Sequence, residues 1–140
     1  MCRVGQLPDP THTNTVYMKK SILILGDILA ILLTTLIGFA THREADMSFL
    51  PRMAAIFFPL TISWLVLALV LELFDPELAS NSKELWRPVF AMIFAAPLAT
   101  ILRGLLLNSP IIPIFAVVLS LTSAFGMLVW RTIYLFLRRR

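Results

Sequence analysis

The chain has 140 residues, of which 59% are hydrophobic and only 14% are charged, with a formal net charge of +4. A soluble domain is typically about 45–50% apolar and about one quarter charged, so this composition excludes an ordinary soluble protein and predicts an integral membrane protein. The basic residues lie at the ends of apolar segments, where anionic lipid headgroups are their natural partners, and this position argues against nucleic acid as a partner.

The chain begins with a polar segment, residues 1–18, which contains prolines and shows no apolar periodicity. This composition predicts a disordered N-terminal segment. Cys2 is the only cysteine of the chain, so it has no partner for an intramolecular disulfide. The apolar run after Lys20 is longer than the roughly 7–15 apolar residues of a signal peptide, and it contains Asp27. We therefore interpret it as a retained helix.

Four apolar segments follow one another along residues 19–137, and each is long enough to cross a bilayer core of about 30 Å at about 1.5 Å per residue. They cover residues 20–41, 53–74, 87–107 and 112–136. The third has the shortest uncharged part, because Arg103 lies within it. A basic tail, residues 138–140, closes the chain. The predicted fold is all-α, an integral membrane four-helix bundle in which consecutive helices run in opposite directions.

The Lys and Arg residues are distributed unequally between the two predicted sides of the membrane. Of the 12, three lie on the side opposite the termini, namely Arg43, Arg52 and Arg103. The other nine, on the side of the termini, are Arg3, Lys19, Lys20, Lys83, Arg87, Arg131, Arg138, Arg139 and Arg140. Because cytoplasmic loops carry the excess of basic residues, we predict a multi-pass protein of the cell membrane with both termini cytoplasmic.

Asp27 is a single acid inside the first apolar segment, and a charge at the centre of a bilayer costs about 2.5–3.5 kcal/mol on insertion scales. On a helix, Asp27 shares one face with Ala30, Thr34, Gly38 and Thr41, which recur at three- and four-residue spacing. Small residues let helices approach closely in lipid, so this is the predicted packing face of the first helix. Asp27 then points into the bundle.

A similar stripe on the fourth segment supplies a partner for Asp27. It contains Ala116, Ser120, Ser123, Met127, Arg131 and Tyr134. Arg131 and Asp27 both lie about 10 Å inside the same edge of the membrane, at about 1.5 Å per residue, and the first and fourth helices are neighbours in such a bundle. We predict an intramembrane ion pair between them, with Glu72 as a competing partner for Arg131. A purely structural pair, a ligand or proton site, and a contact to another subunit all stay open as roles.

A second group of polar residues lies on the opposite, outer side. His42 and Arg43 close the first segment and Arg103 lies near the end of the third, so together they are candidates to bind an anionic group such as a phosphate or carboxylate. The alternative is that these long side chains extend to lipid headgroups. No metal-ligand spacing is present, because His12 lies in the polar lead and His42 in a loop. We expect no metal site and no other cofactor.

Known catalytic motifs are missing from the chain. It contains no nucleophile elbow, no Gly-rich phosphate loop and no His-Glu-x-x-His motif. We therefore do not expect an enzyme. The expected partners are membrane lipids, with a membrane-protein partner or a second copy of the chain as further candidates.

Several stretches, taken together, resemble the prokaryotic membrane-protein family called domain of unknown function 3054. They are the Gly26-Asp27 pair, IGFATHRE (37–44), FPLTISW (58–64), PLATILRGL (97–105) and GMLVWR (126–131). The resemblance covers roughly residues 20–135. It implies a small four-helix membrane protein of unassigned activity, and it adds weight to Asp27, Arg43, Arg103 and Arg131, which fall within the matching stretches.

Two classes of function agree with these patterns. The first is a structural or accessory membrane protein that binds lipid or a partner. The alternative is a small four-helix transporter that acts as a dimer, with Asp27 as the acid that couples a proton or substrate. Small multidrug transporters carry a glutamate in the first helix and a nearly balanced distribution of Lys and Arg, whereas this chain is strongly asymmetric. We favour the first class.

Overall fold

The computed structural model describes residues 10–41 and 50–139, and within these ranges the chain is helical and contains no strand. Its elements are α1 (Pro10–Thr41), α2 (Leu50–Val70), two short 3₁₀ turns η2 (Leu78–Ser80) and η3 (Ser82–Glu84), α3 (Trp86–Leu107) and α4 (Pro113–Arg139). Four of the helices contain stretches that are long and apolar enough to cross a membrane: Lys19–Thr41, Leu50–Val70, Ser82–Leu107 and Pro113–Arg138.

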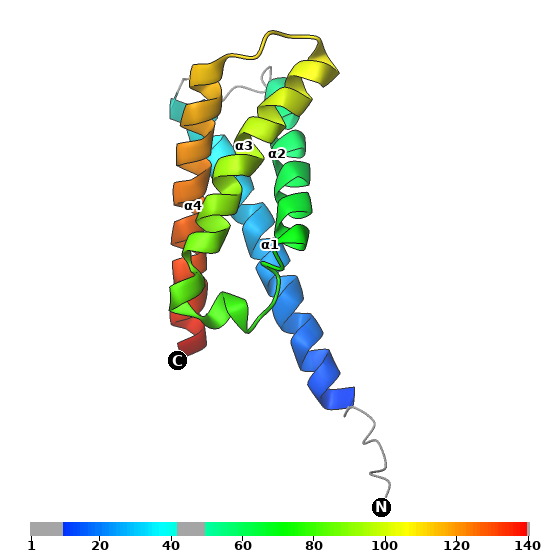
Figure 1. The fold of residues 1–140 in the computed structure, drawn as a ribbon, viewed down its shortest axis with the longest axis vertical. Helices are drawn as coiled ribbons and strands as arrows, with labels where there is room; N and C mark the ends of the chain where they lie inside the picture. The colour runs from blue at the N-terminus through cyan, green and yellow to red at the C-terminus, as the bar shows by residue number, and fades with distance from the viewer. Residues whose placement is uncertain (1–9, 42–49, 140) are drawn as a thin grey trace, which may run out of the picture.

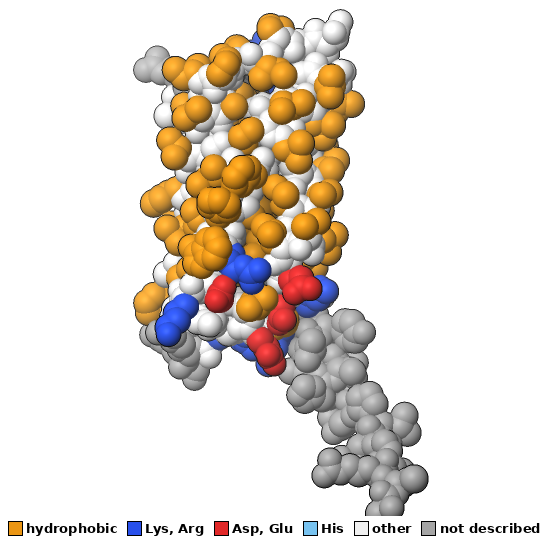
Figure 2. Space-filling model, viewed as in Figure 1, with side chains coloured by type: hydrophobic (Ala, Val, Ile, Leu, Met, Phe, Trp, Pro, Cys, Tyr) orange, Lys and Arg blue, Asp and Glu red, His pale blue; other side chains and the backbone are white. Residues whose placement is uncertain are grey.

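The four long helices run alternately up and down, so that α1 begins and α4 ends at the same end of the bundle (Figure 1). We call this the proximal end, and we call the opposite end, where the short α3–α4 connection lies, the distal end. Helix α3 packs on α2 and α4, and α1 packs on the same two helices from the other side. Apolar side chains cover most of the surface seen in Figure 2, whereas charged side chains gather near the proximal end.

Small residues on α3 allow its close approach to the neighbouring helices. Ala91, Ala95 and Ala99 recur every four residues, and all three are buried. They pack in one core with larger side chains of α2, of which Trp64 is fully buried. In a bilayer, lipid tails are as apolar as the helix surfaces, so there is no hydrophobic driving force for helix association. Close van der Waals packing of this kind then supplies much of the attraction between helices.

The first helix starts earlier than the sequence predicts. Residues 1–9 lie outside the described residues, but residues 10–18, predicted to be disordered, are helical in the structure. Proline is favoured in the first turn of a helix, because the backbone N–H that it lacks would have no acceptor within the helix there. Helix nucleation is the unfavourable step, and the apolar part of α1 has already passed it. Each further residue at the N-terminus then only extends an existing helix. Local composition therefore underestimated the length of α1.

The second helix ends earlier than predicted, at Val70 instead of residue 74. Glu72 adopts a left-handed conformation with a φ of 55°. Its N–H donates to the Leu69 carbonyl at 3.2 Å, and the N–H of Leu73 donates to the Ala68 carbonyl at 2.9 Å. This pattern is a Schellman motif, in which the chain reverses and Leu73 packs back on Ala68. The turn is decisive for the proximal site, because it turns the Leu73 carbonyl away from α2.

The buried face of α1 also differs from the predicted one. Asp27 is buried as predicted, but Gly38 and Thr41 are exposed, and Ala30 is half-buried. The row that enters the bundle contains Asp27, Ile31 and Thr35, along with Leu23. The contacts of Asp27 set the rotation of α1 about its axis, so residues spaced by four from Asp27 are buried. The small size of a residue did not by itself decide which face of α1 enters the bundle.

The last helix includes most of the predicted basic tail. Helix α4 continues to Arg139, and Arg140 lies outside the described residues. The predicted stripe on α4 faces the core: Ser120, Ser123, Met127, Arg131 and Tyr134 are all buried. At the distal end, α3 ends in left-handed Asn108, whose N–H donates to the Gly104 carbonyl. This cap leads the chain directly into the short connection to α4.

Candidate functional site

Two polar sites lie at opposite ends of the bundle, and the proximal one is an ion pair. Oδ2 of Asp27 lies 2.6 Å from Nη2 of Arg131. The Asp27 side chain is 0% exposed and that of Arg131 is 3% exposed. The indole N–H of Trp130 donates to Oδ1 of Asp27 at 2.9 Å. Both carboxylate oxygens therefore accept hydrogen bonds from α4, which compensates the cost of burying the charge.

Arg131 also binds the turn that follows α2. Its Nη1 donates to the Leu73 carbonyl at 3.1 Å, and Arg138, further along α4, donates to the Pro76 carbonyl at 2.7 Å. Both carbonyls belong to the connection between α2 and α3. Arg131 thus joins α1, α4 and this connection. Glu72, the predicted competitor, is exposed and forms no ion pair with Arg131.

Two glycines let α1 and α4 approach closely around this ion pair. A Cβ added at Gly26 would lie 1.7 Å from the Trp130 ring, so the indole occupies the space that a side chain would need. A Cβ added at Gly126 would lie 2.2 Å from Cγ2 of Thr34. Each helix therefore supplies one glycine that receives a side chain of the other. Gly26 in particular allows Trp130 to reach the carboxylate of the next residue, Asp27.

Several further polar atoms are buried near the core without a hydrogen-bond partner. They are the Ser63 and Tyr134 hydroxyls, Nε of Arg131 and the indole nitrogen of Trp64. The Trp64 indole lies close to Asp27 without meeting hydrogen-bond geometry. Beside Arg131 there is a cavity of about 20 Å³, which has room for one water molecule. The cavity beside Arg131 is therefore too small for a ligand larger than water.

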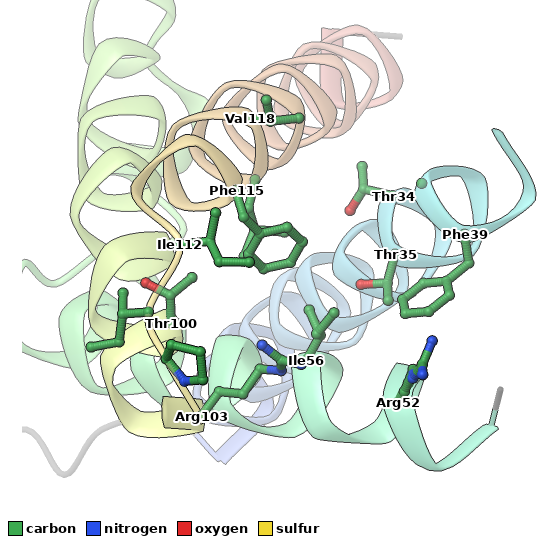
Figure 3. Close-up of a pocket in the computed structure, with 14 residues that line it drawn as sticks. Thr34, Thr35, Phe39, Arg52, Ile56, Thr100, Arg103, Ile112, Phe115 and Val118 are labelled. Atoms are coloured by element: carbon green, nitrogen blue, oxygen red, sulfur yellow. The ribbon is translucent and has the colours of Figure 1, made fainter. Parts of the chain in front are cut away.

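The distal site is a cavity of about 320 Å³ between the four helices (Figure 3). Its lining contains Thr34, Thr35, Gly38 and Phe39 of α1, Arg52 and Ile56 of α2, Thr100 and Arg103 of α3, residues 110–112 of the connection, and Phe115, Val118 and Leu119 of α4. Most of these side chains are apolar, and two of them carry a positive charge. A small, mainly apolar cavity with a few polar groups is the usual form of a ligand site.

Arg103 is the half-buried cation of this cavity. Its guanidinium carbon lies 5.9 Å from the centre of the Phe115 ring, which fits a cation–π contact. Its Nε is buried and has no hydrogen-bond partner. Among the described residues, Arg103 forms no ion pair with an acid. It therefore retains donors for a ligand that presents acidic oxygens.

The structure brings together some of the residues that the sequence singled out. Asp27 and Arg131 are in contact, and Arg103 lines the distal cavity. His42 and Arg43 lie outside the described residues. Within the described ranges, no group of three or more His, Cys, Asp or Glu side chains is arranged to hold a metal ion.

Sequence reasoning missed Trp130, the Leu73 carbonyl and the threonines as site residues, and it placed Thr34 only on the packing face of the first helix. The signal for Trp130 was its place next to Arg131, the predicted partner of Asp27. Gly26 precedes Asp27, and a glycine leaves room for a large side chain of the neighbouring helix. The Leu73 carbonyl carried no signal in the sequence, because a backbone turn exposes it.

Fold and sites together define a class, that of all-helical bundles with four helices long and apolar enough to cross a membrane and with an ion pair buried at one end. Comparison with protein families is more specific. The chain belongs to the family described as protein of unknown function DUF3054, whose model matches residues 24–134. The resemblance of the sequence motifs to this family is thereby confirmed. Comparisons with curated proteins and with solved structures found no match.

Proposed function

We propose that this chain is an accessory protein of the cell membrane, without enzymatic activity, which binds an amphiphilic ligand from the bilayer in its distal cavity. The observation that carries the proposal is the cavity of about 320 Å³, which is lined by residues of all four helices. Its apolar walls suit a hydrocarbon chain, and Arg103 suits a polar head. The buried ion pair at the proximal end then has a structural role, because it holds α1 against α4 and thereby helps to keep the cavity walls in place.

A cavity-filling variant tests the proposal. Gly38 lines the cavity, and a Cβ added there meets no atom within 4 Å, so Gly38→Leu fills space without a backbone clash. Ala40→Leu is the matched control, because Ala40 is exposed on the same helix and does not line the cavity. Native mass spectrometry of the full chain from its own membrane should detect bound amphiphile for the parent and for Ala40→Leu, and little for Gly38→Leu. Equal occupancy in all three would refute the proposal.

The proposed orientation places both termini in the cytoplasm. Supporting it are the excess of Lys and Arg on the side of the termini and the shared end at which α1 begins and α4 ends (Figure 1). A reporter that is active only in the cytoplasm, fused after Arg140 or before Met1, should give a signal in both cases. An impermeant thiol reagent should label a cysteine placed at Ala45 in intact cells, in a Cys2→Ser background. Absence of the reporter signal at either terminus would contradict this orientation.

The second candidate is a dimeric transporter that uses Asp27 as its coupling acid. The contacts of Asp27 argue against it, because both carboxylate oxygens are bound by α4 and the side chain is fully buried. Exchange of a proton or substrate would require α1 to separate from α4. A stable monomer in mild detergent would count against this candidate, whereas a dimer that takes up a cation or drug in exchange for protons would displace the proposal above.

A further inference from the structure

The distal cavity has hydrogen-bond donors on Arg103 and acceptors on Thr34 and Thr35, and their positions indicate which groups a ligand should carry. We propose that it binds a single-chain amphiphile with a phosphate group and, next to the phosphate, a free hydroxyl on the side of the hydrocarbon chain. This inference rests on the proposed binding function and specifies the chemistry of that ligand.

The anionic part follows from Arg103. Its buried Nε lacks a partner, and the Phe115 ring lies beside the guanidinium. Arg52 adds a second positive charge to the lining, while no acidic side chain of the described residues contributes to it. A guanidinium fork matches the geometry of phosphate oxygens, and it binds them with charge-assisted hydrogen bonds.

The hydroxyl part follows from two threonines of α1. The hydroxyl of Thr34 donates to the carbonyls of Ala30 and Ile31 at 2.8 and 3.0 Å, and that of Thr35 donates to the Ile31 carbonyl at 2.8 Å. Each hydroxyl has one proton, so both oxygens face a ligand as acceptors. Figure 3 shows the two oxygens on the side of α1 that faces Phe115. A ligand that satisfies them must carry a donor.

The order of the phosphate and the hydroxyl along the ligand follows from how far Arg103 and the two threonines lie from the distal end. Arg103 lies four residues before the end of α3, about 6 Å inside it, whereas Thr34 and Thr35 lie seven and six residues before the end of α1. At about 1.5 Å per residue, the threonines are about 10 Å inside the end of their helix. A ligand whose phosphate lies at Arg103 therefore places its donor deeper, on the side of the hydrocarbon chain.

The single chain follows from size. Cavities for compact ligands have volumes of about 300–1,000 Å³, so the 320 Å³ cavity is at the small end of this range. It has room for a head and part of one chain, which Ile56, Val118 and Leu119 would contact. In a diacyl lipid an ester replaces the free hydroxyl of the single-chain form. An ester has only acceptor oxygens, so it cannot form hydrogen bonds with the threonine oxygens.

The experiment measures apparent Kd values from the thermal shift of the full chain in mild detergent. The probes are monoacylglycerol phosphate, its deoxy analogue 3-acyloxypropyl phosphate, diacylglycerol phosphate, uncharged monoacylglycerol and chain-free glycerol phosphate. We expect monoacylglycerol phosphate to bind most tightly. Tighter binding of the diacyl form, of the uncharged form or of glycerol phosphate would overturn the proposal, and it would identify a bilayer lipid, a neutral amphiphile or a free phosphate as the ligand.

Variants link each part of the probe to a residue. Arg103→Gln should weaken binding of monoacylglycerol phosphate by about tenfold or more, as expected when a charge-assisted hydrogen bond is lost, and should leave binding of the uncharged form unchanged. Arg87→Gln, at the other end of α3, is its control. Thr35→Val should weaken binding of the hydroxyl probe and not of the deoxy analogue, whereas Thr122→Val, an exposed threonine with a similar backbone bond, should change neither.

Failure of this inference is distinguishable from failure of the proposed function. If Gly38→Leu abolishes binding while Arg103→Gln and Thr35→Val have no effect on any probe, the cavity binds a ligand but the assigned headgroup chemistry is wrong. If Gly38→Leu leaves the binding of every probe unchanged, both are wrong.

Discussion

The two ends of the bundle each contain an arginine inside an apolar helix, and the two arginines have opposite surroundings. Arg131 at the proximal end is bound by a carboxylate and a backbone carbonyl, and almost none of its surface is exposed. Arg103 at the distal end contacts an aromatic ring and borders an open cavity. Burial of a charge is tolerated when partners compensate it. We therefore expect Arg131 to stabilise the fold, whereas Arg103, which has no acidic partner among the described residues, is the arginine that we propose for ligand binding.

The largest effect should come from breaking the proximal pair. Asp27→Asn and Arg131→Gln should each lower the free energy of unfolding by about 3–5 kcal/mol, because each leaves a buried charge without its partner. The double variant should recover much of this loss, as measured by denaturant unfolding in detergent. The control is the more exposed pair Glu84 and Arg87, 3.8 Å apart, whose loss should cost less than about 1 kcal/mol. Additive effects of the two substitutions at the proximal pair would contradict a direct interaction.

The glycines that join α1 to α4 should give the next largest effect. Gly26→Ala and Gly126→Ala should each destabilise the protein by about 1–3 kcal/mol or more, because the new Cβ overlaps Trp130 or Thr34. Gly38→Ala is the matched control on α1, and it should be neutral or stabilising by up to about 1 kcal/mol, since alanine favours a helix and meets no neighbour there. Equal loss of thermal stability in all three variants would mean that α1 and α4 do not pack as described.

Arg103→Gln tests whether the distal arginine contributes to stability as Arg131 does. Without ligand, this change should cost no more than about 1 kcal/mol, the value of the lost cation–π contact with Phe115. The loss should be several times smaller than for Arg131→Gln in the same unfolding assay. A loss of stability as large as that of Arg131→Gln would show that Arg103 is a structural residue.

A small stabilising effect should come from a substitution in the turn that supplies the Leu73 carbonyl. Glu72→Gly should raise the free energy of unfolding by up to about 1 kcal/mol, because glycine adopts a φ of 55° without the steric cost that a side chain adds. Glu77→Gly is the control, since Glu77 has an ordinary φ of −74°. Destabilisation by Glu72→Gly would mean that the glutamate side chain has a role of its own.

The pattern of apolar and charged residues was enough to predict the four long apolar helices that the described residues form. Long apolar segments with charges at their ends have one physical solution in lipid, since only a helix satisfies the backbone within a single segment. The depths of Asp27 and Arg131 along their helices were also readable, because rise per residue is constant. For the same reason, the face of α4 that contains Ser120, Ser123 and Arg131 could be assigned from periodicity.

Tertiary structure alone decided which small residues make contact, where α2 ends and what each arginine meets. Gly26 and Gly38 are alike in the sequence, yet one receives Trp130 and the other faces open space, because the contacts of Asp27 fix the rotation of α1. The Leu73 carbonyl became a partner for Arg131 only through the left-handed turn at Glu72. Such contacts depend on how helices are placed against each other, which a periodic pattern does not encode. The cavity at Arg103 arises in the same way. It is the space left between four helices whose packing is set by contacts outside the cavity.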